Sequence, residues 1–202
     1  ESATLKLNET AAILRAKGDP VIHLGGGEPK GKPPLDAILA ATSLLTSAEV
    51  RYTPPDGIPA LKQAIIRYTE EFYGWRPAPE QVMASGGAKQ AIMSALHAIL
   101  DPQQEVVFPA PYWVSYPERV VGSYTKAVIL NSPNNPTGAV YPEQLIADVV
   151  DFCERRDLYL IMDDIYHRLL FDGQRPTNCY QYAKDRSENS KLILINGVSK
   201  QY

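Results

Sequence analysis

Apolar residues along the chain recur at two spacings, one typical of helices and one typical of buried strands. Helical spacing predicts helices over 3–17, 35–45, 58–73, 91–100 and 142–155. Short unbroken apolar runs predict strands over 21–24, 82–84, 105–108, 126–130, 158–162 and 192–195. A further short strand is expected over 168–171 and a helical segment over 180–185. The alternation of strand and helix predicts a three-layer α/β fold, with a mostly parallel sheet and helices on both faces.

Composition and charge narrow the class of protein. The 202 residues suffice for one full domain, or one domain and a piece of another, and 45% are hydrophobic. The net charge of −3 gives no reason to expect nucleic acid or an anionic membrane as a partner. No stretch reaches the ~18 apolar residues of a membrane span, and no signal-peptide pattern begins the chain, so we expect a cytoplasmic protein. Cys153 and Cys179 are far apart and outside any CxxC pattern, which predicts neither a disulfide framework nor a metal site.

Polar loops follow several of the predicted strands. Residues 25–29, Gly-Gly-Gly-Glu-Pro, form either a plain turn or a loop whose backbone can approach a ligand. Residues 85–90, Ser-Gly-Gly-Ala-Lys-Gln, separate a strand from a helix, and this arrangement directs backbone N–H groups at an anion such as phosphate. The segment lacks both the GxGxxG and the GxxxxGK patterns, so the signal is only moderate.

The remaining loops carry aromatic, amide, carboxylate and amine groups. Their candidate residues are Tyr112, Trp113, Asn135, Asp163, Tyr166 and Lys200. Because ligands of open α/β sheets bind at the carboxyl ends of the strands, these side chains are expected to converge on one edge.

Lys200 and Asp163 have the chemistry of an imine-forming cofactor site. A lysine held at the end of a buried strand can form an imine with a carbonyl compound, because partial desolvation exposes the neutral amine. Taken alone, Lys200 is better explained as an ordinary solvated lysine than as a catalytic one, and Asp163 as a solvated residue at the end of a strand. Together with the other loops they fit pyridoxal 5′-phosphate. Its phosphate needs the start of a helix, and its ring nitrogen needs a carboxylate. Its ring needs a flat side chain to stack on, and its aldehyde needs a lysine.

Seven segments then resemble, in order, the motifs of class I aminotransferases. These are fold-type I pyridoxal-phosphate enzymes of the aspartate aminotransferase group, and the resemblance implies their large-domain fold. The segments are GGGEP (25–29), RYTPPDG (51–57), SGGAKQA (85–91), PYWVSYPE (111–118), NSPNNPTG (131–138), DDIY (163–166) and NGVSK (196–200).

The resemblance implies a role for each residue at the catalytic centre. Lys200 would form the internal aldimine with the cofactor and then move a proton between the substrate Cα and the cofactor. Asp163 would pair with the ring nitrogen. Tyr166 and Asn135 would hydrogen-bond the ring hydroxyl, and Trp113 would stack on the ring. Asn135 and Trp113 would also border the substrate.

The same resemblance implies the residues that hold the phosphate and the substrate. Gly87, Ala88 and Lys89 match the phosphate-binding segment, and Lys89 is also a candidate to meet a distal carboxylate of the substrate. Tyr52 matches a tyrosine that reaches the phosphate of a partner subunit, which implies a homodimer. Gly27 matches a loop glycine near the substrate carboxylate.

The implied activity is amino transfer by a ping-pong mechanism. The enzyme would be an aspartate aminotransferase, or a prephenate or aromatic one, that works with 2-oxoglutarate. Two alternatives stay open: a β-eliminating lyase with the same cofactor, and the non-catalytic effector domain of a transcription regulator. The regulator predicts an attached helix-turn-helix, and no such segment precedes the helix over 3–17.

The domain plan implied by the resemblance is incomplete. Residues 1–27 would form an N-terminal arm and part of a small domain, and residues 28–202 an incomplete large domain. Few residues separate the segments 111–118 and 131–138, which suggests a gap near Val120 and Val121. Members of the family continue after the lysine with arginines for the phosphate and the substrate, so the chain as given is expected to be inactive.

Overall fold

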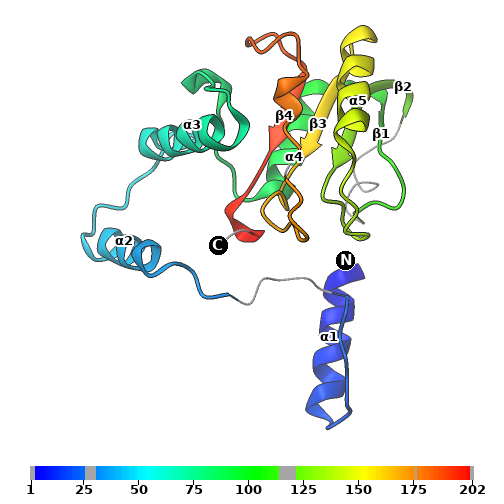
Figure 1. The fold of residues 1–202 in the computed structure, drawn as a ribbon. Helices are drawn as coiled ribbons and strands as arrows, with labels where there is room; N and C mark the ends of the chain where they lie inside the picture. The colour runs from blue at the N-terminus through cyan, green and yellow to red at the C-terminus, as the bar shows by residue number, and fades with distance from the viewer. Residues whose placement is uncertain (1–2, 26–30, 114–121, 176, 201–202) are drawn as a thin grey trace.

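Four parallel strands form one sheet, which helices cover on both sides (Figure 1). The computed structural model describes residues 3–25, 31–113, 122–175 and 177–200. The strands lie in the order of the chain: β1 (Gln103–Val107), β2 (Gly122–Asn131), β3 (Tyr159–Asp163) and β4 (Leu192–Ile195). Each pair of neighbours is parallel, so the carboxyl ends of all four strands lie at one edge.

The described residues also form five α-helices and three short 3-10 helices. The α-helices are α1 (Ala3–Ala16), α2 (Leu35–Thr46), α3 (Pro59–Tyr73), α4 (Ala88–Ile99) and α5 (Glu143–Arg155). The 3-10 helices are η1 (Pro79–Gln81), η3 (Cys179–Gln181) and η4 (Val198–Lys200). The ends of α3 follow ordinary helix chemistry, because proline occupies its first turn and Gly74 ends it in the left-handed conformation.

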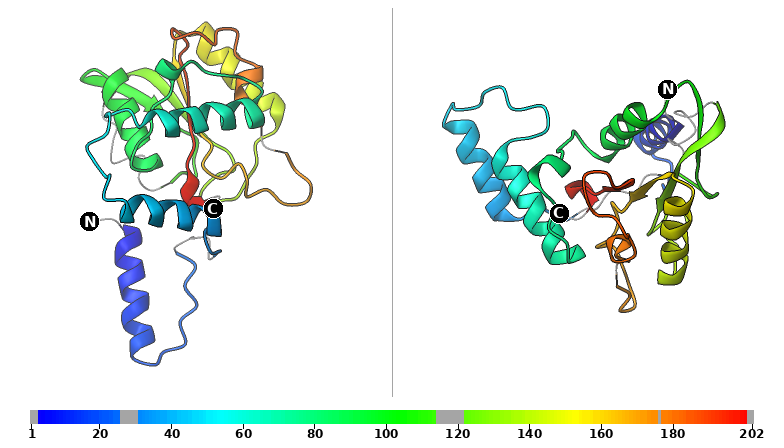
Figure 2. Two further views of the ribbon diagram at one scale, coloured as in Figure 1. Left: turned by 90° about the vertical axis from the view of Figure 1, so that its left-hand side faces the viewer. Right: turned by 90° about the horizontal axis from the view of Figure 1, so that it is seen from above.

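Alternate side chains of β2, β3 and β4 enter two separate cores, one on each face of the sheet. On one face, α4 packs against a cluster that includes Ile129, Ile161 and Ile195. On the other face, α5 packs against a cluster that includes Leu160 and Met162. The view from above shows α4 and α5 on opposite sides of the strands (Figure 2). This alternation confirms the predicted sheet, since a strand buried on both faces reads as an unbroken apolar run.

Helices α1 and α2 lie away from the sheet in the views of Figures 1 and 2. No residue of α2 is buried, and Leu35, Leu39 and Leu45 are exposed on it. Neither helix contributes to the two cores of the sheet. None of the helices in the described ranges has the length and apolar character that crossing a membrane requires.

Three predicted strands are wrong, because their backbones find no neighbouring strand. The segment 82–84 is extended, but the N–H of Ala84 donates to the carbonyl of Asp56 in a loop. The segment 21–24 leaves Ile22 and Leu24 almost fully exposed. The segment 168–171 continues a turn in which the N–H of Leu169 donates to Tyr166. An apolar run of three or four residues gives the composition of a strand but not its partner.

Two predicted helices differ from the observed ones in extent. Helix α4 begins at Ala88 rather than at residue 91, because Gly87 already caps it. The segment 180–185 contains only the end of η3, which stops at Gln181.

Candidate active site

The carboxyl ends of β2, β3 and β4 are in register at one row of residues. Asn131, Asp163 and Ile195 lie opposite one another in this row. The Asn131 side-chain amide donates to the carbonyl of Asp163 at 2.9 Å. The N–H of Asp164 donates to the carbonyl of Ile195 at 2.9 Å, which carries the pairing one residue past the row. The loops that follow these strands therefore start from fixed positions.

Asp163 is a buried carboxylate on the α4 side of the sheet. Its side chain is 5% exposed, and Asp163 follows Ile161 by two residues, so the two side chains point to the same face. The N–H of Ile165 approaches Asp163 Oδ1 at 3.5 Å. A carboxylate at this depth is costly unless donors or a cation compensate its lost hydration, which makes the site suited to a positively charged group.

The loop that follows β2 is held by its own side chains. Asn131 Oδ1 accepts a hydrogen bond from the N–H of Asn135 at 2.7 Å. The Thr137 hydroxyl donates to Asn134 Oδ1 at 2.8 Å, and Ser132 Oγ accepts from the N–H of Tyr141 at 2.9 Å. The predicted turn-rich segment is therefore a rigid loop that presents Asn135 at a fixed position.

Asn135 and Tyr166 meet across the loops after β2 and β3. Asn135 Nδ2 donates to the Tyr166 hydroxyl oxygen at 3.1 Å. Burial raises the pKa of Tyr166, and the negative charge of Asp163 adds to this effect, whereas the Asn135 hydrogen bond opposes it. Tyr166 therefore stays a neutral phenol at pH 7, with its own O–H proton available to a ligand.

The start of α4 has the features of an anion site. Gly87 is the N-cap, with φ 104° and ψ 164°, a conformation that is essentially restricted to glycine. The N–H of Gly86 donates to Gln90 Oε1 at 2.5 Å, which fixes the turn before the helix. The first turn of α4 contains no acidic residue, so no fixed carboxylate opposes an anion at its N–H groups.

Lys89 and Trp113 lie together at this end of α4. Lys89 Nζ is 5.1 Å from the centre of the Trp113 ring, a cation–π distance. Trp113 is half-buried against the core between α4 and the sheet. The predicted ring-stacking residue and the predicted phosphate segment are therefore neighbours.

Lys200 is the last residue of η4, five residues beyond the end of β4, and its side chain is half-buried. The turn before it is fixed by the N–H of Gly197, which donates to Asn196 Oδ1 at 2.7 Å. Two other predicted residues are not brought to this edge by the described contacts. Tyr52 is fully exposed, and Gly27 lies outside the described residues.

Four polar residues next to the predicted site were not predicted from the sequence. Tyr73, Asp164, His167 and Asn196 form buried or half-buried hydrogen bonds on the opposite face of the sheet. The alternation of strand side chains could have indicated Asp164 and Asn196, because each follows a residue that faces α4. No local pattern marks Tyr73, which lies 91 positions before Asp164.

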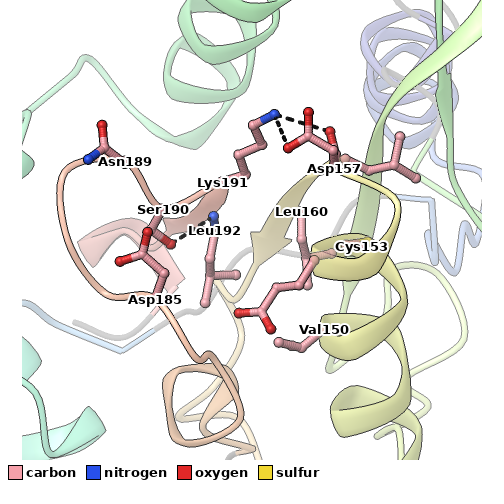
Figure 3. A pocket seen from close by; sticks show the side chains of 11 residues that line it. Val150, Cys153, Asp157, Leu160, Asp185, Asn189, Ser190, Lys191 and Leu192 are labelled. Atoms are coloured by element: carbon pink, nitrogen blue, oxygen red, sulfur yellow. Dashed lines mark hydrogen bonds and ion pairs between the residues drawn. The ribbon is translucent and has the colours of Figure 1, made fainter.

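A pocket of about 210 Å³ lies at the other end of the sheet, between α5 and the segment before β4 (Figure 3). Lys191 and Asp157 form an ion pair at its border, with Nζ 2.5 Å from Oδ1. Leu160 and Leu192, at the beginning of β3 and β4, also line it. This pocket is therefore separate from the row of Asp163.

A family model described as "Aminotransferase class I and II" matches residues 19–123 and 118–202 of the chain. The aspartate/prephenate aminotransferase of Thermus thermophilus is 33% identical over 229 residues. The aspartate aminotransferase of Geobacillus stearothermophilus is also 33% identical over 229 residues. Both alignments include 100% of this chain and 58% of the relative, so the chain spans a little over half the length of these relatives.

Solved structures agree with the sequence comparisons. Aspartate aminotransferase from Thermus thermophilus with maleate superposes with a TM-score of 0.89 at 33% identity, covering 99% of this chain and 58% of that one. Aspartate aminotransferase from Rhizobium meliloti gives a TM-score of 0.88 at 31% identity, covering 100% and 57%. The fold of this chain is therefore the fold of these enzymes over the part that they share.

The aligned region of the relatives is longer than this chain. The alignments run over 229 residues, whereas the chain has 202. The two matched segments of the family model overlap at residues 118–123, next to Val120 and Val121. A gap near Val120 and Val121 stays a prediction from the sequence.

Proposed function

The chain belongs to the class I and II aminotransferase family, and from this premise we propose that it forms the cofactor-binding part of an amino-acid aminotransferase that uses pyridoxal 5′-phosphate. The observation that carries the proposal is the buried Asp163 carboxylate, in one row with Asn131 and on the α4 side of the sheet. Aspartate is the first candidate for the amino donor and an aromatic amino acid the second, with 2-oxoglutarate as the acceptor; prephenate, a 2-oxo acid, is a candidate for the acceptor only. The names of the relatives support this order, since most are aspartate aminotransferases and two also name prephenate.

The polar groups of this edge fit the heterocycle of the cofactor. Asp163 is an acceptor in a buried position, which suits a protonated ring nitrogen. Asn135 and Tyr166 already form a pair that can bond a ring hydroxyl from two sides. Trp113 offers a flat apolar face for the ring.

The chain also has groups that suit the phosphate and the aldehyde of the cofactor. The first turn of α4, with Gly87, Ala88 and Lys89, suits the phosphate because helix N–H groups and a lysine charge both favour an anion. Lys200 supplies a primary amine, which condenses with an aldehyde by losing water. When bound, the cofactor supplies that aldehyde and a ring that withdraws electrons from the substrate's Cα.

Each residue then has a defined task. Lys200 Nζ would be the base that accepts the proton from the substrate's Cα, and it would later give that proton back. Asp163 would accept a hydrogen bond from a protonated ring nitrogen and so favour the protonated form of the ring. Tyr166 is neutral at pH 7, so its hydroxyl would act as a hydrogen-bond donor without losing its proton. Lys89 is proposed to meet either the phosphate or a distal carboxylate of the substrate.

The larger assembly belongs to the same proposal. We propose a homodimer in which the fully exposed Tyr52 reaches the phosphate site of the partner subunit. Residues 1–27 are proposed to serve as an arm and a part of a small domain, and residues 28–202 as the cofactor-binding domain. Gly27 as a contact of the substrate carboxylate and the cytoplasmic location stay predictions from the sequence.

A spectroscopic titration tests the cofactor proposal. Pyridoxal 5′-phosphate is added to the full-length protein, and its visible absorbance is compared in wild type and in Lys200→Ala. We expect a bound band in wild type that is lost in Lys200→Ala. Lys191→Ala is a matched control, because Lys191 lies at the opposite end of β4 and pairs with Asp157. A wild-type protein without any bound band would contradict the proposal.

A product assay separates amino transfer from the alternatives. Aspartate and 2-oxoglutarate are expected to yield oxaloacetate and glutamate. Ammonia and pyruvate released from a substrate with a β leaving group, with no glutamate formed, would instead identify a lyase. A bound cofactor with no turnover of either kind would identify the non-catalytic effector domain.

A further inference from the structure

A second cluster of polar side chains lies behind the proposed cofactor site, on the α5 face of the sheet. We call it the backing cluster and define it as Tyr68, Tyr73, Asp164, His167 and Asn196. Asp164 and His167 are 1% and 2% exposed, and Tyr73 is 3% exposed. These residues come from α3 and from the loops after β3 and β4.

Strand alternation places the two clusters back to back. Asp163 faces α4, and Asp164, the next residue, faces the opposite core and contacts Tyr73. On β4, Ile195 faces α4, and Asn196, the next residue, also contacts Tyr73. Both loops that carry the proposed catalytic groups therefore begin with a residue of the backing cluster.

The Tyr73 hydroxyl joins these two loops. It donates to Asp164 Oδ2 at 2.6 Å and accepts from Asn196 Nδ2 at 2.8 Å. Asn196 Nδ2 also lies 3.1 Å from His167 Nδ1, and the Tyr68 hydroxyl lies 2.5 Å from His167 Nε2. α3 lies beside β4 (Figure 1), so one helix fixes both strand ends.

The backbone pairing between β3 and β4 ends before the chain reaches Lys200. The last paired row is Asp163 and Ile195, and one further backbone bond follows it, from Asp164 to Ile195. Lys200 lies five residues beyond that row, at the end of η4. Asn196 is the first residue after this row, so its hydrogen bond to the Tyr73 hydroxyl lies where β4 leaves the sheet.

We propose that Tyr73 is a positioning residue, which through Asp164 and Asn196 sets the relative placement of Asp163 and Lys200. This inference rests on the function proposed above. A misplacement of reacting groups by about 1 Å can cost roughly a hundredfold in rate, so a bridge between the two loops has a functional consequence. Burial raises the pKa of Tyr73 above that of a free phenol, and the negative charge of Asp164 raises it further, so its hydroxyl stays a donor.

The test compares Tyr73→Phe with wild type in the full-length protein, using pyridoxal 5′-phosphate as the probe. Phenylalanine keeps the ring in the core and removes only the bridging oxygen. We expect cofactor binding to weaken by roughly three- to tenfold, the loss of one buried hydrogen bond. We also expect the pH titration of the bound cofactor's visible absorbance to have a shifted midpoint, because Asp163 and Lys200 would be displaced relative to each other.

Tyr180→Phe is the matched control. Tyr180 is a buried tyrosine of the same core, and its ring centre lies 6.3 Å from that of Tyr73. The control is expected to keep the wild-type affinity and midpoint. If Tyr73→Phe lowers thermal stability but leaves both values unchanged, its role is structural and the inference is overturned.

A second pair of variants applies if Tyr73→Phe does not fold. Asp164→Asn keeps an acceptor for the tyrosine and is expected to behave as wild type, whereas Asp164→Ala is expected to reproduce the weaker binding and the shift. Equal behaviour of both variants and wild type would overturn the inference. If wild type shows no absorbance band of bound cofactor, the proposed function is contradicted and the inference fails with it. If wild type shows the band and the variants keep its cofactor affinity and pH midpoint, only the inference is contradicted.

Discussion

At the residue scale, Asp163 and Asp164 are adjacent carboxyl groups with different surroundings. Asp163 lies at the carboxyl end of β3 on the α4 side, and Asp164 is enclosed by the opposite core, where it accepts a hydrogen bond from Tyr73. Burial raises the pKa of Asp164 well above its usual value, and the neighbouring charge of Asp163 adds to the shift, although the Tyr73 hydrogen bond opposes it. The two residues are therefore expected to respond differently to substitution.

Asp163→Ala is expected to leave the cofactor bound and to slow proton removal from the substrate's Cα by at least about a hundredfold, the scale of losing a charge stabiliser in an active site. Stopped-flow absorbance of the half-reaction with aspartate measures this rate. Asp164→Asn is the control on the other face. Unchanged turnover in Asp163→Ala would show that another group keeps the ring nitrogen protonated.

Asp164→Asn is expected to change how stability depends on pH. A carboxyl group with a raised pKa stabilises the folded state fully below its unfolded value of 3.8, and this contribution is lost as the pH rises through the folded pKa. The amide does not titrate, so the free energy of unfolding of wild type should fall relative to Asp164→Asn as the pH rises above 3.8. Urea unfolding of both proteins across this range measures the difference. A constant difference would show that Asp164 titrates normally.

His167 is a second titratable group of the backing cluster and has to be included in this comparison. Burial lowers the pKa of His167 below 6.5, so its contribution to stability is lost as the pH falls below that value. His167 Nδ1 lies 3.2 Å from the carbonyl of Asp164, so the two titrations are coupled, and the comparison is repeated with His167→Gln in both proteins.

At the element scale, segments that bury a continuous face were predicted correctly, whereas three short apolar runs were wrongly predicted to be strands. Helices α3 and α5 and strands β2, β3 and β4 lie where spacing and apolar runs predicted them, because each buries a continuous face. The segments 21–24, 82–84 and 168–171 have strand composition but no paired neighbour. Pairing depends on residues far away in the chain, which no local pattern reports.

The candidate site was predictable to the same extent. Turn chemistry after apolar strands indicated Asn135, Asp163 and Tyr166, and the structure brings Asn135 to Tyr166. The backing cluster was missed because Tyr73 joins it from α3, far from Asp164 in sequence. Amino-acid patterns indicate which loops are polar, but not which helix holds them.

Gly87→Ala tests the start of α4. Its φ of 104° is unfavourable for a residue with a Cβ, although the added atom would meet nothing within 4 Å. We expect a loss of ~1–3 kcal/mol in unfolding free energy, or a rearranged turn with weaker cofactor binding. Gly31→Ala, at a site without positive φ and with open space for a Cβ, is the control. Thermal unfolding and cofactor titration measure both effects, and a variant equal to wild type in both would show that this conformation is not required.

At the scale of the whole molecule, the chain covers one part of the family fold. It spans 58% of the length of its relatives, and α2 exposes large apolar side chains along its whole length. Apolar surface of this kind is usually covered in a complete assembly. The proposed homodimer gives one specific consequence of that view, since Tyr52 would complete the site of its partner.

Mixing two inactive variants of the full-length protein tests this arrangement. In a mixed dimer of Tyr52→Ala and Lys200→Ala subunits, one site carries both changes and the other carries neither. Random mixing is expected to restore about a quarter of the wild-type activity, since half of the dimers are mixed and each has one intact site. Transaminase activity after unfolding and refolding the two together measures it. No recovery would place Tyr52 in the site of its own subunit.

The most direct measurement of the central claim is the identity of the residue that holds the cofactor. The full-length protein is loaded with pyridoxal 5′-phosphate, reduced with borohydride and digested, and the peptides are analysed by mass spectrometry. The account predicts one modified peptide, carrying the added mass of the reduced cofactor on Lys200. Modification at Lys89 or Lys191 instead, or none at all, would contradict the assignment of this strand edge as the active site.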